Sequence, residues 1–330
     1  MENALLEVAK KFNKDTISVE LLAKCRNAIY KAKCIDYSFV LRLSDEQHRN
    51  VKEIESELDF QKYLFDNGAN VAKPLQTESS ESSVMFEFNN SRYIVSAFEF
   101  VDGKDWSERS DDSEEMYIKV GQTLGKIHKL SKGYTPVNVK RRLWNEQQEL
   151  LKADVLFKSY NMKLYDKFVE FMGQMEKEDK TPDNFGLTHG DYLISNYLLC
   201  ENNRLTVIDF DECEYSWFAA DLAICMRCYL FWTEKPEELP LKAKEAEIMH
   251  YNLLLGYSLE NAINKEMVFD LEKYIKIRDF IELAQYIPLM RDNYELNDIE
   301  KKLIDMCLDR ILNNRPFLKF NTSKAEKLLL

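Results

Sequence analysis

The segment that most constrains this chain lies at residues 188–211, where three polar side chains frame two short apolar runs. Asp191 stands five residues before Asn196, and Asp209 follows thirteen residues after Asn196. A polar stretch separates the apolar runs, which is the pattern of a β-hairpin. Because a hairpin folds the chain back on itself, we expect Asn196 and Asp209 to lie side by side. The two runs are Tyr197–Cys200 and Leu205–Ile208, and the turn between them is Glu201–Arg204.

These three polar side chains have the chemistry of a phosphoryl-transfer site. The amide oxygen of Asn196 and the carboxylate of Asp209 are hard ligands that suit Mg²⁺ when phosphate oxygens and water complete its shell. Asp191 would orient an acceptor hydroxyl and take its proton late in the reaction. Phosphoryl transfer requires little more of a protein than this and a grip on the nucleotide. The alternative is a polar loop without catalytic function, but the spacing of Asp209 favours a kinase site.

Length, charge and hydropathy limit the number of domains and the kinds of partner that this chain can have. The chain has 330 residues, which is comfortable for two domains. Its formal net charge of −12 argues against a nucleic-acid partner, because binding to phosphate backbones needs clustered positive charge. The seven cysteines are mostly in apolar runs and are interpreted as buried thiols. We find no signal-peptide core near the N-terminus and no apolar run of membrane-spanning length, which predicts a cytoplasmic protein without a membrane partner. The sequence leaves the oligomeric state open.

The organisation along the chain predicts an α+β protein with two domains, residues 1–101 and residues 102–330. The first shows β-rich runs around one amphipathic helix, and the second is mostly helical and holds the catalytic loop, the metal site and the acceptor pocket. Gly103 is expected to supply the turn between them. The expected N-terminal strands are Ala28–Lys33, Ser38–Leu43, Val71–Leu75, Val84–Phe88 and Tyr93–Phe100, with helices at residues 5–12 and Val51–Phe65. The expected C-terminal helices are Glu114–Leu130, Asn145–Leu156, Leu164–Met175, Ala219–Phe231, Leu241–Leu259, Met267–Tyr286 and Asp298–Leu312.

Two motifs resemble those of the aminoglycoside phosphotransferase family, which also holds choline and homoserine kinases. The first motif is His189-Gly190-Asp191 with Asn196, and the second is Asp209-Phe210-Asp211 with Asp221-Leu222-Ala223 twelve residues after Asp209. The resemblance implies a two-lobed protein-kinase-like fold, with a small β-rich N-lobe and a larger, mainly helical C-lobe. It also implies ATP as the phosphoryl donor, Asp191 as the catalytic carboxylate, and Asn196 and Asp209 as Mg²⁺ ligands.

The N-terminal half departs from that family at one position. Kinase-like folds use a strand lysine, paired with a helix carboxylate, to grip the α- and β-phosphates, but here the strand carries Arg42. An arginine can grip phosphate bidentately, so the exchange is compatible with nucleotide binding. Glu57 is the expected partner of Arg42, and Glu53 is a rival one turn earlier. The alternative for Arg42 is a solvated strand position.

Other residues near these motifs have expected supporting roles. His128 is predicted to be a satisfied buried histidine, His189 to brace the catalytic loop, and Asp221 to cap its helix and bond to that loop. Asp211 is a weaker candidate, either for a water-mediated metal contact or for bracing the loop. By the resemblance, the hinge whose backbone reads the adenine edge is formed by Phe98, Glu99, Phe100 and Val101.

We therefore interpret the chain as an ATP- and Mg²⁺-dependent phosphotransferase that acts on a hydroxyl group of a small molecule. An aminoglycoside, homoserine, choline or a similar amino alcohol is admissible as the acceptor, and the sequence does not separate ATP from GTP. One alternative is a protein Ser/Thr kinase of the same fold, although no obvious activation segment lies between Asp209 and Asp221. The other is a non-catalytic nucleotide-binding module, suggested only by Arg42.

Overall fold

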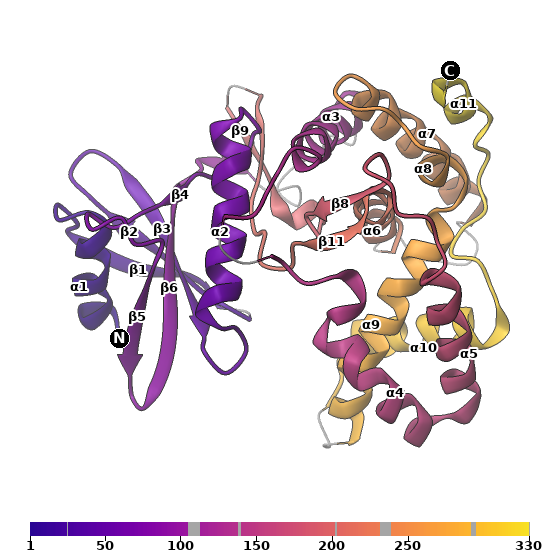
Figure 1. The fold of residues 1–330 in the computed structure, drawn as a ribbon, viewed down its shortest axis with the longest axis horizontal. Coiled ribbons are helices and arrows are strands. Elements are labelled where there is room, and N and C mark those ends of the chain that lie inside the picture. The colour runs from indigo at the N-terminus through magenta and orange to yellow at the C-terminus, as the bar shows by residue number, and fades with distance from the viewer. Residues whose placement is uncertain are drawn as a thin grey trace. The chain divides into compact units, whose positions relative to one another are not determined.

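The computed structural model describes residues 1–24, 26–104, 113–137, 140–201, 203–231, 239–291 and 295–329 (Figure 1). The chain forms two compact units, each built from three segments. These units differ from the two contiguous domains that the sequence predicts, because the hairpin after Asn196 pairs with a strand of the first unit. The first unit comprises Met1–Ser110, Gly133–Arg141 and Ser195–Cys213, and the second comprises Asp111–Lys132, Arg142–Ile194 and Glu214–Leu330.

The first unit is built on a six-stranded antiparallel sheet with the order β1-β2-β3-β6-β4, in which β5 also pairs with β6. Helices α1 (Glu2–Phe12) and α2 (Val51–Asp66) lie on opposite sides of this sheet (Figure 1). Side chains alternate between the faces of a strand, so Phe39 and Leu41 of β3 pack in a cluster with α1. Arg42 of β3 faces α2. The strands are β1 (Ser18–Lys24), β2 (Ala28–Lys33), β3 (Ser38–Asp45), β4 (Pro74–Leu75), β5 (Ser83–Phe88) and β6 (Ser91–Glu99).

The predicted hairpin is present and belongs to a second, three-stranded sheet of the first unit. Its order is β10-β9-β7, where β9 is Tyr197–Cys200, β10 is Leu205–Val207 and β7 is Gly103–Lys104. The turn predicted at Gly103 is wrong, because Gly103 is a strand residue paired with Cys200. A Cβ atom at Gly103 would lie 3.0 Å from the Leu198 Cβ, so glycine permits a close approach of strands here.

The second unit is mainly helical, with one short antiparallel pair of strands, β8 (Phe185–Thr188) and β11 (Glu214–Trp217). Helix α3 packs against α7 so closely that a Cβ at Gly256 would lie 1.9 Å from the Ile118 backbone oxygen. In the ranges given above, no helix is both long enough and apolar enough to cross a membrane. The helices are α3 (Glu114–Ser131), α4 (Gln148–Tyr160), α5 (Met162–Met175), α6 (Phe218–Phe231), α7 (Leu239–Ser258), α8 (Lys265–Phe269), α9 (Leu271–Arg291), α10 (Asp298–Asn313) and α11 (Ser323–Glu326).

The elements that the sequence analysis missed are short or lie at an edge. Among the described residues, strand β1 pairs with β2 alone and buries one of its residues, Val19, so its side chains show no alternation to detect. Strands β8 and β11 are four residues long and form a two-stranded sheet, with one isolated bridge from Tyr215 of β11 to Leu143. Most of the longer helices and strands agree with the predicted ranges to within a few residues, because their apolar faces are long enough to show a period.

Candidate active site

Arg42 and Glu57 form a buried ion pair between strand β3 and helix α2. The Nη1 and Nη2 atoms of Arg42 donate to the two carboxylate oxygens of Glu57 at 2.7 and 2.8 Å, and their side chains are 4% and 2% exposed. Burial alone would lower the pKa of Arg42, but the Glu57 carboxylate more than offsets this and raises that pKa above its ordinary value. Arg42 therefore stays cationic and is held in one orientation.

Glu53, the alternative partner predicted for Arg42, instead caps helix α2. Its side chain accepts from the backbone N–H of Asn50 at 2.9 Å, while its own N–H donates to the Asn50 side chain at 3.1 Å. This reciprocal pair is a capping box that starts helix α2. Glu53 is thus occupied at the helix N-terminus, and Glu57, one turn later, lies beside Arg42.

The guanidinium of Arg42 also approaches Asp209. The Nη1 atom lies 3.6 Å from the Asp209 Oδ1, and the Asp209 side chain is 44% exposed. The backbone of Asp209 has a φ of 64°, a left-handed conformation that aspartate adopts more readily than most residues. Such uncommon backbone conformations gather at ligand sites, where the surrounding structure holds them.

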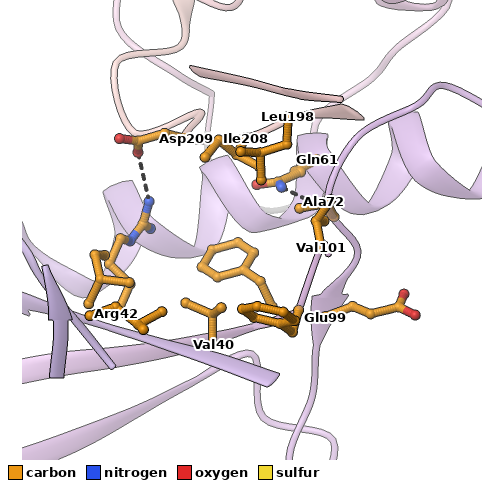
Figure 2. A pocket seen from close by; sticks show the side chains of 13 residues that line it. Val40, Arg42, Gln61, Ala72, Glu99, Val101, Leu198, Ile208 and Asp209 are labelled. Atoms are coloured by element: carbon orange, nitrogen blue, oxygen red, sulfur yellow. Dashed lines mark hydrogen bonds and ion pairs between the residues drawn. The ribbon is translucent and has the colours of Figure 1, made fainter. Parts of the chain in front are cut away.

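A cavity of about 250 Å³ in the first unit ends at this ion pair (Figure 2). In Figure 2, Val40 lies on one wall and Leu198 and Ile208 lie on the opposite wall. Arg42 points toward Asp209 at one end, and Val101 lies at the other end. An apolar slot with charged groups at one end suits a flat ring that carries a charged tail. The lining residues are Leu22, Ile29, Val40, Arg42, Gln61, Ala72, Phe98, Glu99, Phe100, Val101, Leu198, Ile208 and Asp209.

The predicted hinge lines this cavity, but its residues present different groups. The backbone N–H of Glu99 donates to the Lys73 oxygen at 2.9 Å, and the Glu99 side chain points away from the cavity in Figure 2. The Phe98 ring packs 5.2 Å from the Arg42 guanidinium carbon. The backbone of Phe100 and Val101 is therefore the part of the hinge best placed to contact a ligand.

Asn196 lies next to the strand that leads to Asp209. The backbone oxygen of Asn196 accepts from the N–H of Ile208 at 3.0 Å, and Tyr197 pairs with Val207 in the hairpin. Within the described parts of the chain, no group of three or more His, Cys, Asp or Glu side chains could hold a metal ion. Mg²⁺ needs no such group, since one amide oxygen and one carboxylate can hold it together with phosphate oxygens and water. The donor set of Asn196 and Asp209 fits that requirement.

Two acidic residues that follow Asp209 form contacts with parts of the first unit that are distant in sequence. Asp211 accepts from the Asn27 side chain at 3.2 Å, and Glu212 pairs with both Arg26 and Arg49. Asp211 is thus engaged with the loop after β1, and its predicted metal contact stays a prediction.

Asp191 belongs to the second unit, where the loop before it is fixed by Asp221. The buried Asp221 carboxylate accepts from the backbone N–H groups of His189 and Gly190 at 2.7 and 2.9 Å. Gly190 has a φ of 79°, a conformation in which glycine carries no steric cost. The prediction that Asp221 bonds to the loop before Asp191 is confirmed.

Two histidines complete this support. His128 is fully buried, with its ring nitrogens 3.0 Å from Asp221 Oδ2 and 3.1 Å from the Tyr257 hydroxyl, as predicted for a satisfied buried histidine. Burial lowers the pKa of His128, which keeps the ring neutral. The backbone N–H of Asp191 donates to His189 Nδ1 at 3.3 Å, so His189 braces the loop as predicted.

A family model described as the phosphotransferase enzyme family matches residues 30–248, which is more than half of the chain. The chain belongs to the phosphotransferase enzyme family. This phosphotransferase is 24% identical over 328 residues to amicoumacin kinase of Bacillus subtilis (strain 168), and the match covers 98% of this chain and 95% of that protein.

Solved structures confirm the fold of the phosphotransferase. Amicoumacin kinase hAmiN, in complex with AMP-PNP, Ca²⁺ and Ami, matches with a TM-score of 0.86 at 21% identity, covering 98% of this chain and 97% of that one. The choline kinase LicA from Streptococcus pneumoniae matches with a TM-score of 0.62 at 14% identity, covering 94% and 98%. The predicted α+β, kinase-like fold is confirmed, and the family match makes the protein a phosphotransferase.

The structure of the phosphotransferase brings most of the predicted nucleotide residues to one cavity. Arg42, the 98–101 hinge and Asp209 line it, and Glu57 lies behind Arg42. Asp191 lies in the second unit, while Asn196 and Asp209 lie in the first. The sequence analysis missed the apolar walls of the cavity. Val40 was detectable, because it stands two residues before Arg42 on one strand and thus shares its face.

Proposed function

We propose that this protein transfers the γ-phosphoryl group of ATP to a hydroxyl group of a small molecule, with Mg²⁺ as the cofactor. The observation that carries the proposal is the cavity of the first unit, with apolar walls, a hinge at one end and the Arg42–Asp209 pair at the other. The complex of hAmiN with AMP-PNP supports a nucleoside triphosphate as the ligand.

In this proposal the adenine ring lies between Val40 on one wall and Leu198 and Ile208 on the other. The backbone of Phe100 and Val101 contacts the edge of the ring. Arg42, held by Glu57, contacts the phosphates with a planar fork that suits phosphate oxygens. Since backbone groups contact the ring, GTP remains an alternative donor to be tested beside ATP.

Asn196 and Asp209 would hold Mg²⁺, which when bound neutralises the charge of the transferring phosphoryl group. The side chain of Asp209 would then exchange its contact with Arg42 for the ion. Asp191 would orient the acceptor hydroxyl and accept its proton. The support from Asp221 and His189 fixes the loop that carries Asp191, so that little reorganisation is needed at the moment of transfer.

The acceptor is proposed to be a small, hydroxyl-bearing compound, in a cytoplasmic enzyme that needs neither nucleic acid nor membrane. The relative named amicoumacin kinase makes amicoumacin the first acceptor to test. The aminopropanol kinase, the choline kinase and the spectinomycin phosphotransferase among the structural matches add aminopropanol, choline and spectinomycin to the panel.

A coupled assay of ADP release across this panel, with Mg²⁺ and ATP, tests the proposal. The expected result is transfer to at least one acceptor, and Asp191→Asn should lower its rate by about 10²- to 10⁴-fold. Asp183→Asn is the matched control, because that carboxylate is 84% exposed in the same unit and should leave the rate unchanged. Raised melting temperature with ATP in both variants would show that the nucleotide site is intact.

Three results would contradict the proposal. Near-normal turnover in Asp191→Asn would refute the role of Asp191. Stabilisation by ATP without ADP release for any acceptor would favour a nucleotide-binding module. Phosphate transfer to casein with none to the small molecules would favour a protein kinase.

A further inference from the structure

The proposed catalytic carboxylate is paired with an arginine that no sequence motif identifies. Arg278 lies on helix α9, 87 residues after Asp191 in the chain. Its Nη1 atom lies 3.2 Å from Asp191 Oδ1, and the two side chains are 21% and 22% exposed. Both residues belong to the second unit, so this pairing depends only on the packing within that unit.

A series of linked ion pairs anchors the Arg278 side chain. The Nε atom of Arg278 donates to Glu282 Oε1 at 2.9 Å, one helical turn away. Glu282 Oε1 also lies 3.7 Å from Arg227 of helix α6. Arg227 in turn donates to the fully buried Asp279 at 3.2 Å, and Asp279 accepts from Arg310 of α10 at 2.7 Å. The guanidinium of Arg278 is therefore anchored on one side and presented beside Asp191 on the other.

This arrangement has a chemical consequence for any acceptor whose hydroxyl reaches Asp191. The groups bonded to the hydroxyl-bearing carbon must then lie close to a fixed, partly desolvated cation. A guanidinium donates well to carbonyl and carboxylate oxygens, because its planar fork matches their geometry. An ammonium group in the same place would be repelled, since like charges at short range are unfavourable and the protein screens them less than water does.

We propose that Arg278 determines acceptor specificity, by binding a carbonyl or carboxylate oxygen next to the reacting hydroxyl. The preferred substrate class is then a hydroxy amide or hydroxy acid, and hydroxyl groups flanked by an ammonium group are disfavoured. This inference rests on the proposed function and on Asp191 as the carboxylate that receives the hydroxyl. It differs from a purely structural role, in which Arg278 would hold Asp191 and affect all acceptors alike.

Matched pairs of acceptors separate these two roles. Lactamide and 1-amino-2-propanol share the carbon that bears the hydroxyl and differ in the neighbouring group, as do glycerate and 3-amino-1,2-propanediol. We expect the wild-type protein to show a kcat/KM ratio of about tenfold to a hundredfold in favour of the first member of each pair, the range typical of one hydrogen bond to a charged group.

Three variants of helix α9 complete the experiment. Arg278→Gln should bring the ratio within each pair close to one, and Arg278→Lys should retain part of the preference because it keeps the charge. Lys276→Gln is the matched control, since it removes a cation from the same helix that contacts the Phe171 ring instead of Asp191. It should leave the ratio unchanged. Melting temperatures with and without ATP report whether each variant folds and retains its nucleotide site.

The outcomes distinguish the inference from the proposed function. A wild-type ratio near one, or an unchanged ratio in Arg278→Gln, would overturn the specificity role. An equal fall in kcat/KM for both members of a pair would assign Arg278 a purely structural role and would also overturn it. Failure of the wild-type protein to phosphorylate any acceptor, with ATP bound, would refute the proposed function and the inference with it.

Discussion

The ion pair of Arg42 and Glu57 allows folding and nucleotide binding to be tested separately. Replacing Arg42 with methionine removes the partner of a carboxylate that is 2% exposed. An uncompensated buried charge costs about 3–5 kcal/mol, which lowers the melting temperature by roughly 10 °C for a domain of this size. Glu57→Met should cost less, because Asp209 remains 3.6 Å from Arg42 and still compensates its charge.

The double variant Arg42→Met with Glu57→Met carries the test. Since two packed apolar side chains can replace a buried ion pair at little or no cost, this variant should melt close to the wild-type temperature. It should nevertheless lose its response to ATP, because the cation proposed to hold the phosphates is gone. Wild-type protein at an ATP concentration of 100 times Kd is stabilised by about 2.7 kcal/mol, which is readily measured as a rise in melting temperature.

The assay is thermal unfolding of each variant with and without ATP and Mg²⁺. Arg92→Met is the matched control, because Arg92 is 55% exposed and pairs with Glu46 and Glu87 at the surface of the same unit. It should change stability by at most about 1 kcal/mol and keep the ATP response. The reasoning would be refuted if Arg42→Met had the melting temperature of the wild type, or if the double variant were less stable than Arg42→Met. It would also be refuted if the melting temperature of the double variant still rose with ATP.

Three further predictions concern the second unit. Asp221→Ala leaves three buried or part-buried hydrogen-bond donors without their acceptor. It should cost several kcal/mol of stability, measured by chemical unfolding, and most of the activity, measured by ADP release. Burial lowers the pKa of His250 to about 4, so only the unfolded chain takes up this proton as pH falls from 6.5 to 4. Stability should therefore decline by about 3 kcal/mol over that window, and His250→Gln should flatten the decline measured by urea unfolding. Gly256→Ala forces a Cβ to within 1.9 Å of the Ile118 oxygen and should lower stability by more than about 1 kcal/mol. Gly173→Ala is the contrasting case, because the space around Gly173 is open, and it should raise stability by about 0.5–1 kcal/mol.

Local patterns explain which parts of the fold and site could be predicted from the sequence. The hairpin, the long helices and the alternating strands follow from apolar periods of a few residues, which the chain displays directly. The choice of Glu57 over Glu53 was also within reach, because Asn50 three residues before Glu53 forms a recognisable capping box. Strand β1 could not be predicted, because a mostly exposed edge strand has no buried face and so shows no apolar pattern.

By itself, the sequence of this protein determined the chemistry: carboxylates and an amide at fixed spacing, and an arginine on a strand of the N-terminal half. The tertiary structure alone decided which groups meet. It surrounded a cavity with Val40 and Leu198, which are remote in the chain, and it placed Arg278 of helix α9 against Asp191. The physical reason is the separation in sequence over which each effect acts. Periodicity and capping act over a few residues, whereas a contact across 87 positions depends on how whole helices pack, and no local pattern records that packing.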